Sequence, residues 1–237
     1  MEPLVEIKNL SIRFPEGNST FEAVKGISFS IGKGEIVGVV GESGSGKSMS
    51  ALALMGLLPK DAEIASGSLC FQGEDLVTMK PEKRRQLCGS KMAMVFQEPM
   101  TSLNPVLKIE RQVGESLRIH TKLGNAEIHE RVVQALSEVG LPDPEGLCGK
   151  YPHELSGGMR QRVMIAQAMI NSPSLLIADE PTTALDCVVQ AQILELLRNI
   201  HRTKGTSILF ISHDLNVVRA LCSRVIAVSY THLRAHE

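Results

Sequence analysis

Alternating apolar and polar positions at the start of the chain predict an antiparallel β element. Residues 4–14 and 27–31 each show the period-two alternation of a strand that buries one face. Residues 15–20 lie between them and contain Pro, Gly, Asn and Ser, which are residue types that favour turns. We therefore expect two strands with a turn region at residues 15–20.

Short apolar runs in the rest of the chain predict buried parallel strands. The first run covers residues 35–40, and a glycine-rich loop and a helical pattern over residues 47–58 follow it. Helical patterns separate the later runs, as the crossover connections of a parallel sheet require. The later runs are residues 92–96, 175–178, 207–211 and 225–228. An α/β fold is the predicted class.

The pattern becomes mostly helical between residues 99 and 171. Its clearest helix ends at residues 140–142 and carries five apolar residues on one face: Ile128, Val132, Val133, Leu136 and Val139. No internal repeat or low-complexity linker divides the sequence. We predict one domain over residues 1–228, with a helical subdomain at about residues 99–171 inserted in it, and an atypical, truncated or foreign tail at residues 229–237 that adds little to the fold.

Composition limits the classes of partner. The 237 residues are 43% hydrophobic and 22% charged, which is typical of a globular protein. A formal net charge of −1 gives no general attraction to nucleic acid or anionic lipid. Five cysteines without a C-x-x-C pair predict neither a disulfide framework nor a zinc site and favour a reducing cytosol. Since no apolar run reaches about 18 residues, we expect contact with a membrane only as a peripheral subunit.

A glycine-rich loop follows the strand predicted at residues 35–40. Residues 41–48 match G-x-x-x-x-G-K-[ST] and lie between a strand and a helix, as this phosphate-binding motif requires. Its backbone N–H groups would face phosphate oxygens, Lys47 would reach the β- and γ-phosphates, and Ser48 would bind Mg²⁺. The sequence thus predicts a P-loop NTPase core that binds nucleotide through Gly41, Glu42, Ser43, Gly44, Ser45, Gly46, Lys47 and Ser48.

Two carboxylates end the apolar run at residues 175–178. Asp179 stands where the second acidic motif of a P-loop ATPase belongs and is the predicted Mg²⁺ residue. Glu180 follows it and is the predicted general base for the attacking water. An Asp-Glu pair after a strand is by itself more often a solvated helix cap, so these roles depend on the P-loop.

Residues 155–161, Leu-Ser-Gly-Gly-Met-Arg-Gln, distinguish one P-loop family from another. A Ser and two glycines at the start of a helix make a second anion site. The stretch resembles the signature motif of ABC ATPases, and the resemblance extends over residues 3 to about 228. In that family the signature serves the ATP of a partner subunit, which implies that Ser156, Gly157 and Gly158 bind nucleotide across a head-to-tail dimer.

The resemblance implies further site residues. Gln97 matches the residue that contacts Mg²⁺ and the attacking water, and His213 matches the switch histidine beside the γ-phosphate. Asp186 matches the loop that crosses the dimer interface. Phe14 is the predicted adenine-stacking aromatic, with Phe21 as the alternative, although a Phe in a strand more often belongs to the core.

Two stretches, residues 97–105 and 155–162, are similar to ATP-binding subunits of bacterial oligopeptide, dipeptide and nickel importers. This resemblance implies a peripheral subunit on the cytoplasmic face of the cell membrane, with ATP and Mg²⁺ as cofactors. The implied partners are two permease subunits, an external solute-binding protein and a second ATPase subunit, either a paralogue or another copy. The loop after Gln97 would help to dock the permeases, unless it is only a Pro-broken surface loop.

Two other functions remain as alternatives. An ABC ATPase that acts on nucleic acid usually has two ATPase units or a long coiled-coil insertion, and this sequence has neither. We therefore expect no nucleic-acid partner. A non-hydrolysing fragment is the second alternative, favoured by the unusual residues 229–237.

Overall fold

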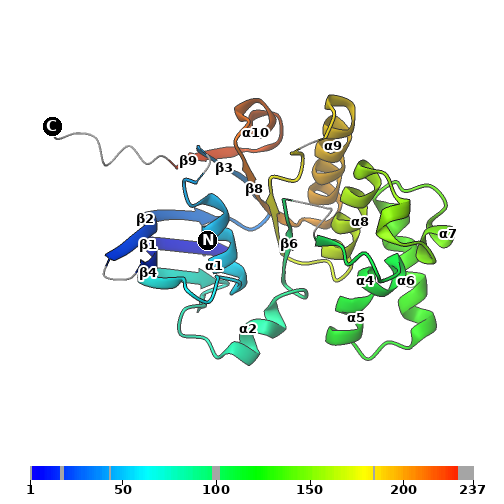
Figure 1. Cartoon of the computed structure of the whole chain (residues 1–237), viewed down its shortest axis with the longest axis horizontal. Helices are drawn as coiled ribbons and strands as arrows, with labels where there is room; N and C mark the ends of the chain where they lie inside the picture. The colour runs from blue at the N-terminus through cyan, green and yellow to red at the C-terminus, as the bar shows by residue number, and fades with distance from the viewer. Residues whose placement is uncertain (1, 17–18, 43, 98–101, 184, 229–237) are drawn as a thin grey trace. The chain divides into compact units, whose positions relative to one another are not determined.

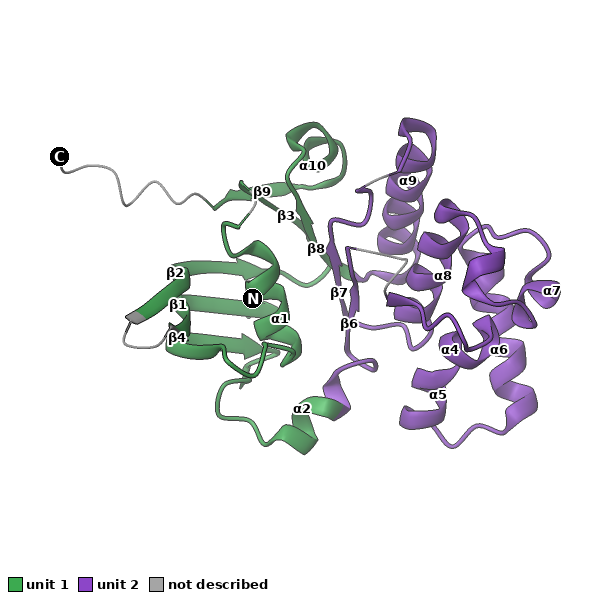
Figure 2. Ribbon diagram, viewed as in Figure 1, with its two compact units in different colours: residues 1–85, 207–237 green, residues 86–206 purple. Residues whose placement is uncertain are grey.

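The computed structural model describes residues 2–16, 19–42, 44–97, 102–183 and 185–228. The chain divides into two compact units, residues 1–85 with 207–237 and residues 86–206 (Figure 2). The predicted tail and part of the loop after Gln97 lie outside the described residues. Both units combine strands with helices (Figure 1).

An antiparallel sheet opens the first unit (Figure 1). Its strands β1 (Val5–Glu16), β2 (Ser19–Ile31), β4 (Glu63–Phe71) and β5 (Glu74–Asp75) have the order β2-β1-β4-β5. The predicted strand pair is confirmed, but β2 begins at Ser19 rather than at residue 27. Register shifts between β1 and β2, together with the positive φ of Gly26, break the alternation that marks a strand in the sequence.

Three parallel strands complete the sheet structure of the first unit. Strand β3 (Ile36–Val40) is fully buried and pairs with β8 (Ser207–Ser212) on one side and with β9 (Arg224–Ala227) on the other. Helix α1 (Lys47–Met55) follows β3, and α10 (Leu215–Leu221) follows β8. Helix α1 ends three residues before the predicted residue 58, because Gly56 adopts a left-handed conformation that closes the last turn.

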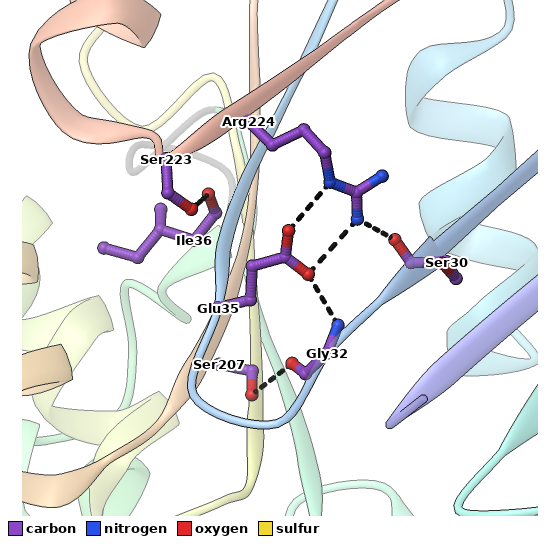
Figure 3. A network of polar contacts seen from close by, with 7 residues as sticks. All are labelled: Ser30, Gly32, Glu35, Ile36, Ser207, Ser223 and Arg224. Atoms are coloured by element: carbon purple, nitrogen blue, oxygen red, sulfur yellow. Dashed lines mark hydrogen bonds and ion pairs between the residues drawn. The ribbon is translucent and has the colours of Figure 1, made fainter. Parts of the chain in front are cut away.

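A polar network joins three segments of the first unit around Glu35 (Figure 3). Arg224 of β9 donates hydrogen bonds from Nε to Glu35 Oε1 at 2.8 Å and from Nη2 to Oε2 at 3.2 Å. The amide of Gly32 donates to the same Oε2 at 2.6 Å, and Ser207 Oγ of β8 donates to the Gly32 carbonyl at 3.2 Å. The hydrogen bond from Arg224 holds the pKa of the Glu35 carboxyl below its ordinary value. The network thus fixes the turn that leads from β2 into β3.

The second unit places helices around a parallel strand pair. Strands β6 (Met92–Val95) and β7 (Leu175–Asp179) lie on two of the predicted apolar runs, and they pair directly in parallel. The stretch predicted as helical contains α4 (Ile109–Val113), α5 (Glu115–His120), α6 (Asn125–Glu138), α7 (Pro144–Cys148), the 3₁₀ helix η1 (Pro152–Glu154) and α8 (Gly157–Met169). Helix α9 (Cys187–Lys204) follows β7, and α2 (Pro81–Leu87) runs from the first unit into the second.

Candidate functional site

The glycine-rich loop begins where β3 ends and leads directly into α1, which is the context that the sequence predicts. The buried Lys47 ammonium group donates hydrogen bonds to the carbonyl oxygens of Gly41 at 2.8 Å and Glu42 at 2.7 Å. A third donation, to Ser45 Oγ, spans 3.3 Å. The cation therefore lies against the loop and is held there by neutral oxygens. Ser43 lies outside the described residues.

Two glycines of the loop leave no space for a side chain. A Cβ on Gly41 would lie 2.2 Å from the carbonyl oxygen of Val228, and a Cβ on Gly46 would lie 2.5 Å from that of Ala23. Gly46 also has a φ of 83°, in the left-handed region that glycine tolerates best. The close packing of the loop on neighbouring backbone therefore explains why glycine stands at these positions.

The N-terminus of α1 directs the positive end of the helix dipole toward the glycine-rich loop. Its N-cap residue Gly46 provides no side-chain hydrogen bond, and the first turn holds no acidic residue. Helix termini usually satisfy these amides with a capping side chain, and the positive end of the helix dipole attracts negative charge. The arrangement suits a phosphate group.

The acidic motif lies at the end of β7 in the second unit. Asp179 is 5% exposed, and Glu180 follows it with a φ of 47°, a conformation that is uncommon outside glycine. Glu180 Oε2 accepts hydrogen bonds from Gln97 Nε2 at 3.2 Å and from Thr183 Oγ1 at 2.8 Å. Two residues predicted for hydrolysis, Glu180 and Gln97, are thus in direct contact.

Thr183 is a site residue that the sequence analysis does not predict. Its amide donates to the Glu180 carbonyl at 3.2 Å, which closes a four-residue turn with Pro181 at the second position. Proline is favoured there because its φ is already fixed near the value that the turn needs. The signal in the sequence is therefore Glu-Pro-Thr-Thr, which indicates a turn but not which side chains the turn brings together.

The signature residues begin α8. Ser156 is the exposed N-cap residue, and its Oγ accepts a hydrogen bond from the Met159 amide at 3.3 Å. A Cβ on Gly158 would lie 2.9 Å from Val189 Cγ1 of α9, whereas a Cβ on Gly157 would meet no atom within 4 Å. Packing therefore explains glycine at position 158 but not at position 157.

Three further predicted residues have defined positions. Asp186 is the N-cap of α9, and its Oδ1 accepts from the amides of Val188 and Val189, both at 3.0 Å. His213 is exposed and directly follows β8. Phe14 and Phe21, the two candidates for adenine stacking, lie opposite each other on β1 and β2. Phe14 is half-buried and Phe21 is 48% exposed, so neither belongs to the core.

A phosphate-binding loop after a buried parallel strand, with an acidic motif at the end of another, defines the class of P-loop ATPases. Residues 24–183 match the ABC transporter family model. The chain belongs to the ABC transporter family and carries its ATPase domain.

Relatives within the family are named as transport proteins. The chain is 51% identical over 225 residues to the peptidoglycan transport ATP-binding protein YejF of Agrobacterium fabrum, covering 94% of this chain and 41% of that protein. It is 46% identical over 225 residues to the dipeptide transport ATP-binding protein DppD of Haemophilus influenzae, covering 95% and 68%. The chain thus spans less than half of the first relative and about two thirds of the second.

Solved ABC cassettes share the fold. One is a dimeric cassette in a post-hydrolysis state bound to ADP and phosphate, with 28% sequence identity, a TM-score of 0.84 and 94% coverage of both chains. The predicted fold class, a P-loop core with an antiparallel β part and added helices, is confirmed by this likeness. Among the residues that the structure describes, no helix is long and apolar enough to cross a membrane.

Proposed function

We propose that this protein hydrolyses ATP to drive the import of peptides through partner permeases. The observation that best supports ATP hydrolysis is the contact of Gln97 with Glu180. It joins an amide and a carboxylate that are both predicted to act on the attacking water. Glu180 would accept the proton of that water, and Gln97 would help to orient it. Lys47 and the loop amides would hold the phosphates of the substrate ATP.

Two predicted residues each have the donor chemistry that a Mg²⁺ ion prefers. Ser48 offers a hydroxyl oxygen and the buried Asp179 a carboxylate oxygen, which are the hard donors that this ion prefers. Mg²⁺ commonly binds through one or two protein oxygens together with substrate phosphates, so a larger cluster of protein ligands is not required. When bound, the ion would neutralise charge on the phosphates.

A second copy or a paralogue would complete each ATP site. Ser156 and Gly157 would bind the γ-phosphate of the partner subunit's ATP, since the exposed start of α8 offers amides and a hydroxyl. Asp186 would lie at the interface between the subunits, and His213 would meet the γ-phosphate. Phe14 would stack on adenine, with Phe21 as the alternative on the opposite strand.

The named relatives support a role in transport. The relative from Haemophilus influenzae is a dipeptide transport protein, which favours peptides over nickel as the solute. We place the protein on the cytoplasmic face of the membrane, with two permeases and an external solute-binding protein as partners. Three exposed apolar side chains flank the loop after Gln97 and suit a docking surface for the permeases: Phe96, Val106 and Leu107.

The test separates nucleotide binding from hydrolysis. In the complete transport complex, Glu180→Gln should still bind ATP but lose about 100-fold or more of its hydrolysis rate, because a general base contributes about that factor. Lys47→Ala should weaken ATP binding itself. Glu195→Gln, the same change on an exposed ion-paired carboxylate of α9, is the matched control. Near-normal hydrolysis by Glu180→Gln would refute the assignment of the base.

The solute and the rival function have their own tests. Peptide uptake into vesicles that contain the complex should require ATP and should stop in Glu180→Gln. The rival, an ABC ATPase that acts on nucleic acid, predicts salt-dependent binding to DNA or RNA. The named relatives do not favour it, and we expect no such binding.

A further inference from the structure

The carboxylate of Glu180 is held by two donors on one oxygen. Gln97 Nε2 and Thr183 Oγ1 both donate to Oε2, at 3.2 and 2.8 Å. Because a carboxylate is planar, holding one of its oxygens in place also sets the direction of the other oxygen. The shorter of the two contacts comes from Thr183.

Thr183 is itself fixed by the backbone of the residue that it contacts. Its amide donates to the Glu180 carbonyl at 3.2 Å, and its side chain returns to the Glu180 carboxylate. These two contacts hold the side chain and the backbone of the same turn together. Gln97 lies 83 positions away and reaches Glu180 only through the pairing of β6 with β7. Thr183 is therefore the local support of the Glu180 carboxylate.

The backbone at Glu180 needs such support. Its φ of 47° is a left-handed conformation, which is unfavourable for a residue with a side chain. Strained residues persist where neighbouring contacts fix them, and they often point a functional side chain in a required direction. Here the turn with Thr183 fixes both the backbone and the carboxylate.

We propose that Thr183 is a positioning residue that orients the Glu180 carboxylate for proton abstraction from the attacking water. This inference rests on the proposed role of Glu180 and adds a residue to it. Thr183 does not touch the substrate in this scheme, so its effect passes through Glu180. Replacing the hydroxyl by a methyl group in Thr183→Val keeps the shape of the side chain but removes the donor.

The experiment measures ATP hydrolysis by the complete transport complex. Thr183→Val should lower kcat by about tenfold, as expected when one hydrogen bond to a charged group is lost, with KM for ATP within about twofold of the original value. Thr183→Ser retains the hydroxyl and should restore kcat to within about twofold. Thr203→Val removes a hydroxyl that donates to the Asn199 carbonyl on an exposed part of α9 and should change neither parameter.

A double variant separates this proposal from the function on which it rests. In the Glu180→Gln background, Thr183→Val should cause no further loss, because the residue through which it acts is already removed. If Glu180→Gln alone keeps its hydrolysis, the proposed base is wrong. If Glu180→Gln is inactive but Thr183→Val keeps full kcat, only the role of Thr183 is wrong, and an equal loss in Thr183→Ser would overturn that role too. Thermal midpoints show whether each variant folds, and Thr183→Ala replaces Thr183→Val if the latter does not.

Discussion

Gln97 and Glu180 are 83 positions apart in sequence, yet Gln97 Nε2 donates to Glu180 Oε2 at 3.2 Å. The parallel pairing of β6 and β7 brings them together, because Val95 pairs with Ala178 and both strands end at the same edge. The side chains that follow two adjacent parallel strands meet at that edge, which is where α/β proteins commonly place their chemistry. The contact is therefore a direct consequence of the strand register.

We expect Gln97→Ala to reduce ATP hydrolysis by the complete complex by about tenfold, since it removes a donor that holds the Glu180 carboxylate. Binding of ATP measured separately should change much less, because the P-loop is untouched. The matched control is Gln134→Ala. Gln134 Nε2 donates to Glu138 Oε1 at 2.9 Å on the exposed face of α6, so the control loses the same kind of hydrogen bond. Equal hydrolysis rates in the two variants would contradict a functional role for the contact.

Most of the parallel strands were predictable from sequence. The exception is β9, which was predicted as a buried strand but is mostly exposed, with Val225 41% exposed. The antiparallel strands were predictable only in part. Strands β3, β7 and β8 are buried along their whole length and therefore appear as continuous apolar runs. Strand β4 was not predicted, because its first residues are exposed or half-buried and its sequence contains Ser and Gly. Pairing with β1, rather than a pattern of its own, makes this segment a strand.

The site residues were predictable as far as a motif records them. The loop at residues 41–48 has the residue spacing that phosphate binding requires, so the sequence alone identifies it. The contact of Thr183 with Glu180 depends on a left-handed residue before a proline, which a motif does not show. The role of Asp186 as the N-cap of α9 has a clear signal, an Asp directly before a helical pattern, although the family resemblance had drawn attention to a different role.

Two glycines of the phosphate-binding loop offer a matched test of packing. Gly44 and Gly46 have nearly equal φ values, 82° and 83°, so alanine at either position adopts the same unfavourable backbone conformation. Only at Gly46 would the new Cβ meet a neighbour, the carbonyl oxygen of Ala23 at 2.5 Å, while at Gly44 nothing lies within 4 Å. Gly46→Ala should therefore lose about 1–3 kcal/mol more unfolding free energy than Gly44→Ala. Urea denaturation of both variants measures the difference, and equal losses would show that the loop shifts away from β2 without cost.

Contacts of His129 with two carboxylates should make the stability of the second unit depend on pH. His129 of α6 contacts Glu110 of α4 through Nδ1 at 3.0 Å and Glu145 of α7 through Nε2 at 2.9 Å. Its hydrogen bond with Glu110, followed by that with Glu145, raises the pKa of His129 above its ordinary value of 6.5. Cys148, near both carboxylates, has its pKa raised to about 11, chiefly by burial, and stays a neutral thiol.

The stability that His129 contributes should therefore decline in alkali. A raised pKa in the folded state means that the contribution is complete below the unfolded pKa near 6.5 and is lost as the pH rises through the folded pKa. Thermal midpoints of the unmodified protein and of His129→Gln, measured from about pH 5.5 to 8.5, should differ most at the acid end. A difference that stays constant over this range would show that the imidazolium charge adds nothing to stability.

Ser156 is expected to bind the ATP of a partner copy rather than the ATP of its own chain. Ser156 is exposed at the start of α8, and Gly157 beside it has no neighbour within 4 Å of an added Cβ, so a group from outside the chain can approach both. If the ATP of a partner copy binds there, a Ser156→Arg chain and a Lys47→Ala chain form a mixed dimer with one intact composite site, while each variant alone has none. An equal mixture that pairs at random should regain about a quarter of the original ATP hydrolysis, because half of the dimers are mixed and half of their sites are intact.

The measurement requires mixed dimers to be shown by pull-down with two different tags. If those dimers are present and hydrolyse no more ATP than either variant alone, Ser156 does not act across a subunit interface of identical chains.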